Sequence, residues 1–248
     1  MNSFLSHTSQ FLRKNKEVLV PFIIISLILI GGSLRLKHFL ENRSLWLDEA
    51  ALAINIAQRS FDQILSSTYR DSQLAPTAPI GFLVVEKIMI RLFGLSESAW
   101  RFIPFAVSIF AIVRFLALLR ENFSKLTTIL ALSFFLFSPT LIYYSAELKH
   151  YALDVAFTIF LTWSAFRILN SSKEWNTLLL GILGLFFIIF SYSAIFILPG
   201  VWIVLFTTSV SKKQYKRLRF LLIMAVLWAC LFCALYIFEV RQLSGSSA

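Results

Sequence analysis

Two adjacent carboxylates, Asp48 and Glu49, are the residues best suited to chemistry in this sequence of 248 residues. They precede a stretch whose apolar spacing predicts a helix running toward Phe61, so both lie in its first turn. A carboxylate pair can take a proton as a general base or hold a divalent cation through oxygen ligands. The alternative is that both merely charge the helix N-terminus, where the macrodipole favours negative groups.

A second polar cluster occupies residues 143–154. Glu147, Tyr151 and Asp154 are spaced i, i+4 and i+7, so they share one face if a helix begins there. Such a face predicts substrate contacts. The alternative is an interfacial tyrosine belt with Lys149 paired to Glu147 or Asp154.

Arg101 and Lys149 are basic residues that could contact a phosphate, or could lie among lipid head groups. The three histidines are too scattered along the chain to predict a metal site. Cys230 and Cys233 lie in one apolar run, and we interpret them as packing residues rather than a disulfide or zinc site.

The composition indicates a polytopic membrane protein. Hydrophobic residues make up 58% of the chain, charged residues 15%, and the mean hydropathy is +0.77, outside the range of soluble domains. Several apolar runs are long enough to cross a bilayer as helices. We predict seven spans, at residues 18–34, 100–119, 126–143, 151–169, 175–190, 194–209 and 220–238.

One further apolar stretch, 80–93, carries Glu86, Lys87 and Arg91. Each charge at the bilayer centre would cost about 2.5 to 3.5 kcal/mol. We therefore expect this stretch to form a helix lying in the membrane interface rather than an eighth span.

The distribution of charge supports that placement. With residues 35–99 on one side, the connections on the other side carry the entire net charge of +10, which the positive-inside rule assigns to the cytoplasm. The expected organisation is one membrane domain: residues 1–17 cytoplasmic, 18–34 the first span, 35–99 an external loop, and 100–248 the remaining six spans.

This topology places Asp48 and the 143–154 cluster on the same external side. Trp46 and Leu47 would hold the carboxylates near the membrane surface, where a lipid-carried substrate presents its head group. The fourth span, 151–169, also puts Asp154 about one helical turn inside the membrane, where an ionisable group indicates function.

The motif Trp46-Leu47-Asp48-Glu49-Ala50 after a first span resembles the acidic motif in the first external loop of GT-C class membrane glycosyltransferases. Residues 75–80, 92–104 and 138–154 follow in an order similar to that of the dolichyl-phosphate-mannose protein mannosyltransferase-like branch (glycosyltransferase family 39), which includes bacterial lipopolysaccharide-sugar and aminoarabinose transferases. The resemblance covers about residues 18–170.

The resemblance implies an all-α, seven-span module with juxtamembrane helices in the first external loop. It implies transfer of a sugar from a polyprenyl-phosphate donor to a lipid, glycan or protein acceptor on the external face, usually with inversion. Asp48 would be the general base, and Glu49 would support it or help hold Mg²⁺ or Mn²⁺. Arg101 and Lys149 would contact the departing phosphate. Neither a nucleic acid nor another cofactor is implied.

Two departures from the family pattern concern the site. Thr77-Ala78-Pro79 stands where many members have His-Pro-Pro, and Lys149 stands where many have Arg, so the bidentate fork is lost. Family members usually continue beyond a length such as this, so we expect a truncated or split form. The expected location is a bacterial inner membrane with a cytoplasmic N-terminus. The rival hypotheses are a lipid or solute carrier, a flippase, and an inactive scaffold left by truncation.

Overall fold

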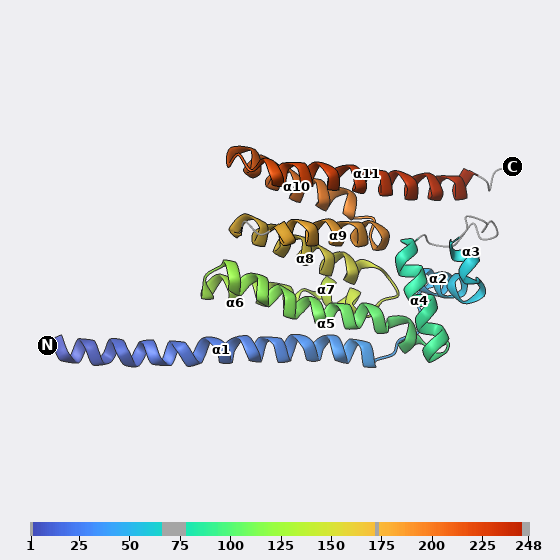
Figure 1. Ribbon diagram of the computed structural model, residues 1–248. Helices are drawn as coiled ribbons and strands as arrows, with labels where there is room; N and C mark the ends of the chain where they lie inside the picture. The colour runs from blue at the N-terminus through green and yellow to red at the C-terminus, as the bar shows by residue number, and fades with distance from the viewer. Residues whose placement is uncertain (1, 66–77, 172–173, 245–248) are drawn as a thin grey trace.

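The computed structural model describes the backbone of residues 2–65, 78–171 and 174–244, and the side chains within 19–65, 78–171 and 175–237. In these residues all regular structure is helical, which confirms the all-α prediction (Figure 1). The elements are α1 (Asn2–Leu40), α2 (Leu47–Gln58), α3 (Phe61–Leu65), α4 (Ile80–Phe93), α5 (Glu97–Asn122), α6 (Lys125–Phe137), α7 (Pro139–Tyr143), the 3₁₀ turn η1 (Tyr144–Ala146), α8 (Tyr151–Asn170), α9 (Glu174–Phe190), α10 (Ala194–Ser211) and α11 (Tyr215–Ser244).

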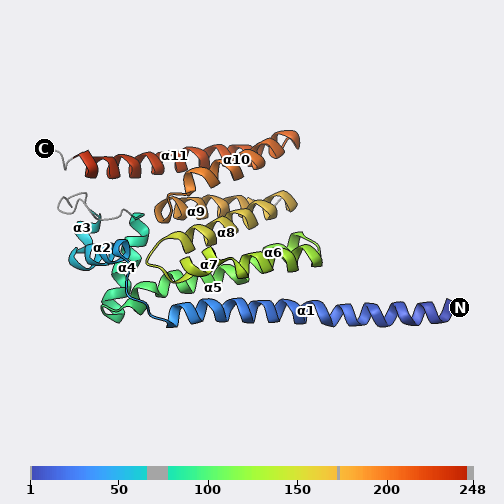
Figure 2. The ribbon, with the colours of Figure 1, turned by 180° about the vertical axis from the view of Figure 1, so that it is seen from behind.

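The long helices lie side by side as a bundle, and the short helices α2, α3 and α4 gather at one end of it (Figure 1). The view from behind shows the same arrangement, with α4 running across the bundle end (Figure 2). Within the bundle α5 packs on α8, α8 on α9, and α9 on α11. The end of α1 and the starts of α5 and α8 therefore meet beside α2–α4.

Hydropathy and length identify membrane spans. Within the residues that the structure describes, five helical segments qualify: Leu19–Leu40, Glu97–Asn122, Tyr151–Asn170, Ala194–Ser211 and Tyr215–Ile237. The pair Lys125–Phe137 and Pro139–Ala146, bent by 56°, makes a sixth if it counts as one span. The protein is thus a multi-pass membrane protein.

The predicted fifth span, residues 175–190, corresponds to α9 (Glu174–Phe190). Its 17 residues rise about 25 Å at 1.5 Å per residue, less than the roughly 30 Å of a hydrocarbon core. It nevertheless lies alongside α8 and α11 in the bundle (Figure 1). The count of seven spans stays a prediction.

The first helix extends further than residues 18–34. It continues without a break to Leu40, and the chain then turns at Asn42, whose φ is 42°, a left-handed conformation that Asn tolerates better than most residues. The external loop predicted at 35–99 is also shorter at its C-terminal end, because α5 begins at Glu97 rather than at residue 100. Ser96 caps this helix by accepting the backbone N–H of Ala99.

The helix α4 has the predicted bounds but an unexpected environment. It packs against α2, α5 and α9, so Glu86 and Lys87 are buried in protein, whereas Arg91 is exposed and lies over the ring of Phe61. Lys87 is buried and donates to the carbonyls of Ile56 and Ala57 at 2.9 and 3.0 Å, the last turn of α2. These bonds satisfy carbonyls that a helix end leaves unpaired and fix α2 against α4.

An apolar cluster beneath α2 and α4 supports the candidate site. Leu52 and Ile56 of α2, Phe82 of α4, Trp100 of α5 and Leu148 are all nearly inaccessible and pack together. Four segments that are distant in sequence therefore share one core at this end of the bundle, which holds the polar residues above it in fixed positions.

Candidate active site

Glu49 and Arg101 form a buried ion pair between the first turns of α2 and α5. Glu49 Oε2 lies 2.9 Å from Arg101 Nη2, and the two side chains are 1% and 2% exposed. Burying two charges is costly unless they are paired and hydrogen-bonded. The remaining contacts of this pair meet that condition.

Each group in the pair has further partners. Glu49 Oε1 accepts the backbone N–H of Leu148 at 2.7 Å, and Oε2 accepts that of Trp46 at 3.0 Å. Arg101 donates to the backbone carbonyl of Arg43. The pair thus ties together the segment before α2, the start of α5 and the segment before α8.

This geometry changes the roles expected for two residues. Arg101 was predicted to contact a phosphate, and Glu49 to support the base or hold a metal. Both are enclosed and fully engaged with each other and with backbone groups. We therefore treat them as positioning residues for the segments around them.

Asp48 and Lys149 form the exposed counterpart of the buried pair. Lys149 Nζ lies 2.6 Å from Asp48 Oδ2, and the side chains are 14% and 49% exposed. The hydrogen bond from Lys149 is the main reason that the pKa of Asp48 lies below its ordinary value. The expected alternatives, Lys149 paired with Glu147 or Asp154, do not form.

Glu147 instead pairs with Arg43, a residue that the sequence did not single out. The guanidinium of Arg43 also lies over the ring of Tyr143, 5.0 Å from its centroid. Burial, and then the charge of Glu49, raise the pKa of Glu147. In the sequence, only its position five residues before Asp48 could have indicated that Arg43 belongs to the site.

The predicted shared face of Glu147, Tyr151 and Asp154 is wrong. The helix α8 begins only at Tyr151, and Glu147 precedes it in an extended conformation with φ −114°. The spacing argument fails because it requires a helix through all three positions. Tyr151 packs edge-on against Tyr144, with 4.7 Å between ring centroids.

Asp154 belongs to a separate polar cluster at the same end. His150 Nε2 lies 3.9 Å from its Oδ2, and the hydroxyls of Ser191 and Ser193 bond to its carboxylate. Its Oδ1 is buried without a hydrogen-bond partner among the described residues. Burial lowers the pKa of His150 to about 4, so this ring is neutral near pH 7.

Glu86 on α4 is fully buried, and neither carboxylate oxygen has a hydrogen-bond partner within the described residues. It lies one turn from Phe82 and one turn from Ile90, both in the apolar cluster under the site. Burial raises its pKa well above the ordinary value. The helix that carries it, α4, lies across the end of the bundle (Figure 1).

The carboxylates do not fit a divalent cation in this arrangement. The oxygens of Glu49 face donors, and Asp48 holds an ammonium group, whereas a cation needs several oxygen ligands turned toward it. In the part of the chain that the structure describes, no three His, Cys, Asp or Glu residues gather closely enough to hold a metal.

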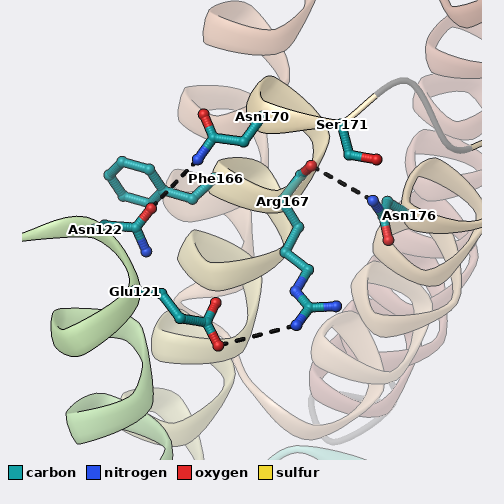
Figure 3. Close-up of a pocket in the computed structure, with 7 residues that line it drawn as sticks. All are labelled: Glu121, Asn122, Phe166, Arg167, Asn170, Ser171 and Asn176. Carbon is teal, nitrogen blue, oxygen red and sulfur yellow. Dashed lines mark hydrogen bonds and ion pairs between the residues drawn. The ribbon is translucent and has the colours of Figure 1, made fainter.

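A polar pocket of about 260 Å³ lies between the far ends of α5 and α8 and the start of α9, away from α2–α4 (Figure 3). Glu121 and Arg167 point toward one another across it, 3.9 Å apart, and Asn170 donates to Asn122 (Figure 3). The pocket contains none of the predicted site residues, so it is separate from the candidate active site.

Comparison with known proteins places the chain in a family. A family model described as dolichyl-phosphate-mannose-protein mannosyltransferase matches residues 77–237, well over half of the chain. Arg101, Lys149 and Asp154 lie in the matched region, and the Asp48-Glu49 motif precedes it. No curated protein and no solved structure gave a significant match. The chain, a multi-pass membrane protein, belongs to the dolichyl-phosphate-mannose-protein mannosyltransferase family of glycosyltransferases.

Proposed function

We propose that this protein transfers a sugar from a polyprenyl-phosphate-linked donor to an acceptor hydroxyl, with Asp48 as general base and Lys149 as the cation that meets the donor phosphate. The observation that carries the proposal is the 2.6 Å contact between the exposed Asp48 and the partly buried Lys149, in a chain that belongs to a glycosyltransferase family. The α2–α4 end would face the external side, because the basic connections lie at the opposite end.

The chemistry requires a base at the acceptor oxygen and a cation at the departing phosphate, on opposite sides of the anomeric carbon. The acceptor oxygen forms a bond to the anomeric carbon while its proton passes to the Asp48 carboxylate. The bond between that carbon and the phosphate oxygen breaks, and its electron pair stays on the polyprenyl phosphate. Lys149 stabilises the negative charge that develops there. Attack opposite to the departing phosphate inverts the anomeric centre.

The ion pair couples donor binding to the strength of the base. While Lys149 contacts Asp48, the pKa of this carboxyl is lowered and the carboxylate is a weak proton acceptor. A donor phosphate that attracts Lys149 removes the main cause of that shift, so the pKa of Asp48 rises toward its ordinary value. The base then becomes stronger once the donor is bound.

The exposed apolar residues next to Asp48 favour a lipid-linked donor. Trp46 and Leu47, directly before Asp48, are both strongly exposed. An exposed Trp beside an exposed Leu is typical of a segment at the membrane–water interface. Asp48 would then lie at the depth of lipid phosphates.

The carrier hypothesis has less support. A carrier would use ionisable groups near the bilayer midplane, whereas Glu86 lies on α4 at the bundle end and Asp154 is in the first turn of α8. Neither position marks a path through the bundle.

The test uses membranes that contain the full chain and a series of radiolabelled polyprenyl-monophosphate sugars. Asp48→Asn should lower sugar transfer by about 10²-fold or more, the usual contribution of a general base. Asp62→Asn removes an exposed carboxylate from α3 at the same end and should leave transfer unchanged. Equal transfer by the Asp48→Asn protein would refute the assignment. A folded wild-type protein that consumes no donor would favour the inactive-scaffold hypothesis.

A further inference from the structure

A recess lies at the bundle end opposite α2–α4, where the short helix α9 meets the turn between α10 and α11. Its volume is about 380 Å³, and its lining residues are Thr177, Lys213, Gln214, Tyr215, Lys216, Arg217 and Phe220. Thr177 is on the first turn of α9, and the others belong to the α10–α11 turn and the start of α11. None of these residues takes part in the candidate active site.

The recess is cationic, unlike the neighbouring pocket of Figure 3. Of the lining residues that the structure describes, Lys213, Lys216 and Arg217 are basic and none is acidic. In the neighbouring pocket the charge of Arg167 is balanced by Glu121 (Figure 3). The basic lining described for this recess therefore suits an anion.

Arg217 is held in place at the edge of the recess. Its Nη1 donates to Gln214 Oε1 at 2.7 Å, and its Nη2 donates to the carbonyl of Ser171 at 2.8 Å. The turn residue Lys213 has φ 52°, and the backbone N–H groups around it bond to carbonyls at the end of α10. The turn that presents the lysines is thus a fixed structure.

Aromatic residues place this recess at the level of lipid head groups. Trp175 at the start of α9 and Tyr215 at the start of α11 are both strongly exposed, as is typical of residues at a membrane interface. From the recess, α11 continues with exposed Leu222, Ile223 and Val226, a surface that suits an acyl chain.

We propose that the recess binds the phosphate head group of an anionic glycerophospholipid, with Lys213 and Lys216 contacting the phosphate and the lipid chains lying along α11. A lipid fits better than a soluble anion because the cations are followed directly by an exposed apolar helix face. The site is independent of the sugar-transfer proposal and lies at the other end of the bundle.

The experiment measures binding of single phosphatidylglycerol molecules to the purified full chain in detergent by native mass spectrometry. Lys213→Gln/Lys216→Gln should weaken binding about tenfold or more, because two charge-assisted contacts to the phosphate are lost. The matched control, Arg120→Gln/Lys125→Gln, removes two exposed positive charges from the connection between α5 and α6 at the same end and should change binding less than about twofold. Thermal unfolding of both variants verifies that they fold.

Three results would overturn the proposal. Equal loss of binding in both double variants would show diffuse attraction to positive charge rather than a site. Equal binding of phosphatidylcholine would show that the anionic charge is not recognised. Displacement of the lipid by millimolar inorganic phosphate would show a site for free phosphate rather than for a lipid.

Discussion

Arg35 of α1 supplies the hydrogen bond that Pro139 cannot make. In a continuous helix the N–H of residue 139 would donate to the carbonyl of Phe135, but proline has no N–H. Arg35 Nη2 donates to that carbonyl at 3.1 Å, and its Nη1 donates to Leu136 at 3.0 Å. A cation from the first helix therefore stabilises the 56° bend between α6 and α7.

Arg35→Met should lower the free energy of unfolding by about 2 kcal/mol, since buried carbonyls lose charged donors. The measurement is thermal or denaturant unfolding in detergent. Lys37→Met, an exposed change on the same helix, is the control and should have little effect. In a Pro139→Ala background the cost of Arg35→Met should shrink, because residue 139 regains its N–H. Identical costs in the two backgrounds would contradict this explanation.

Glu49→Gln should destabilise the protein by about 3 kcal/mol, because it leaves Arg101 charged and buried without its partner. Glu41→Gln, which removes an exposed carboxylate near the end of α1, should change stability by less than about 1 kcal/mol. In the Glu49→Gln background Arg101→Gln should cost much less than it does alone. A Glu49→Gln protein of wild-type stability that no longer transfers sugar would instead indicate a direct catalytic role.

Lys149→Met should move the acid limb of the pH profile of kcat/KM to higher pH. The base must be ionised to act, and its ionisation in the free enzyme sets this limb. Because the Lys149 hydrogen bond lowers the pKa of Asp48, its loss raises that pKa, and activity falls at a higher pH on acidification. Lys37→Met should leave the limb in place. An unmoved limb in Lys149→Met would mean that Asp48 is not the titrating base.

Gly184→Ala should destabilise the contact between α9 and α11 by about 1 to 3 kcal/mol. A Cβ at this position would lie 2.4 to 2.5 Å from ring atoms of Trp228, and the indole is held there by its hydrogen bond to the Gly181 carbonyl. Gly200→Ala in α10 meets nothing within 4 Å, so it should be neutral or stabilising by up to about 1 kcal/mol. Equal unfolding temperatures for the two variants would disagree with this close packing.

Much of the fold follows from local pattern. Long apolar runs predict the spans, and the charges of 80–93 correctly exclude a span there. The break inside the predicted span 126–143 had a visible signal in Ser138-Pro139, because proline interrupts a helix and serine caps the next one. The start of α8 had no such signal, and this is why the predicted face of Glu147, Tyr151 and Asp154 was wrong.

The sequence by itself determined that Asp48 and Glu49 begin a helix beside a membrane, since composition, hydropathy and local spacing are properties of neighbouring residues. It could not determine which carboxylate turns inward, because adjacent helical residues point about 100° apart and either could face the core. Only the tertiary structure pairs Glu49 with Arg101 in the interior and Asp48 with Lys149 at the surface. Those partners lie 52 and about 100 residues away, and the packing of α2, α5 and the segment before α8 on one apolar core brings them together.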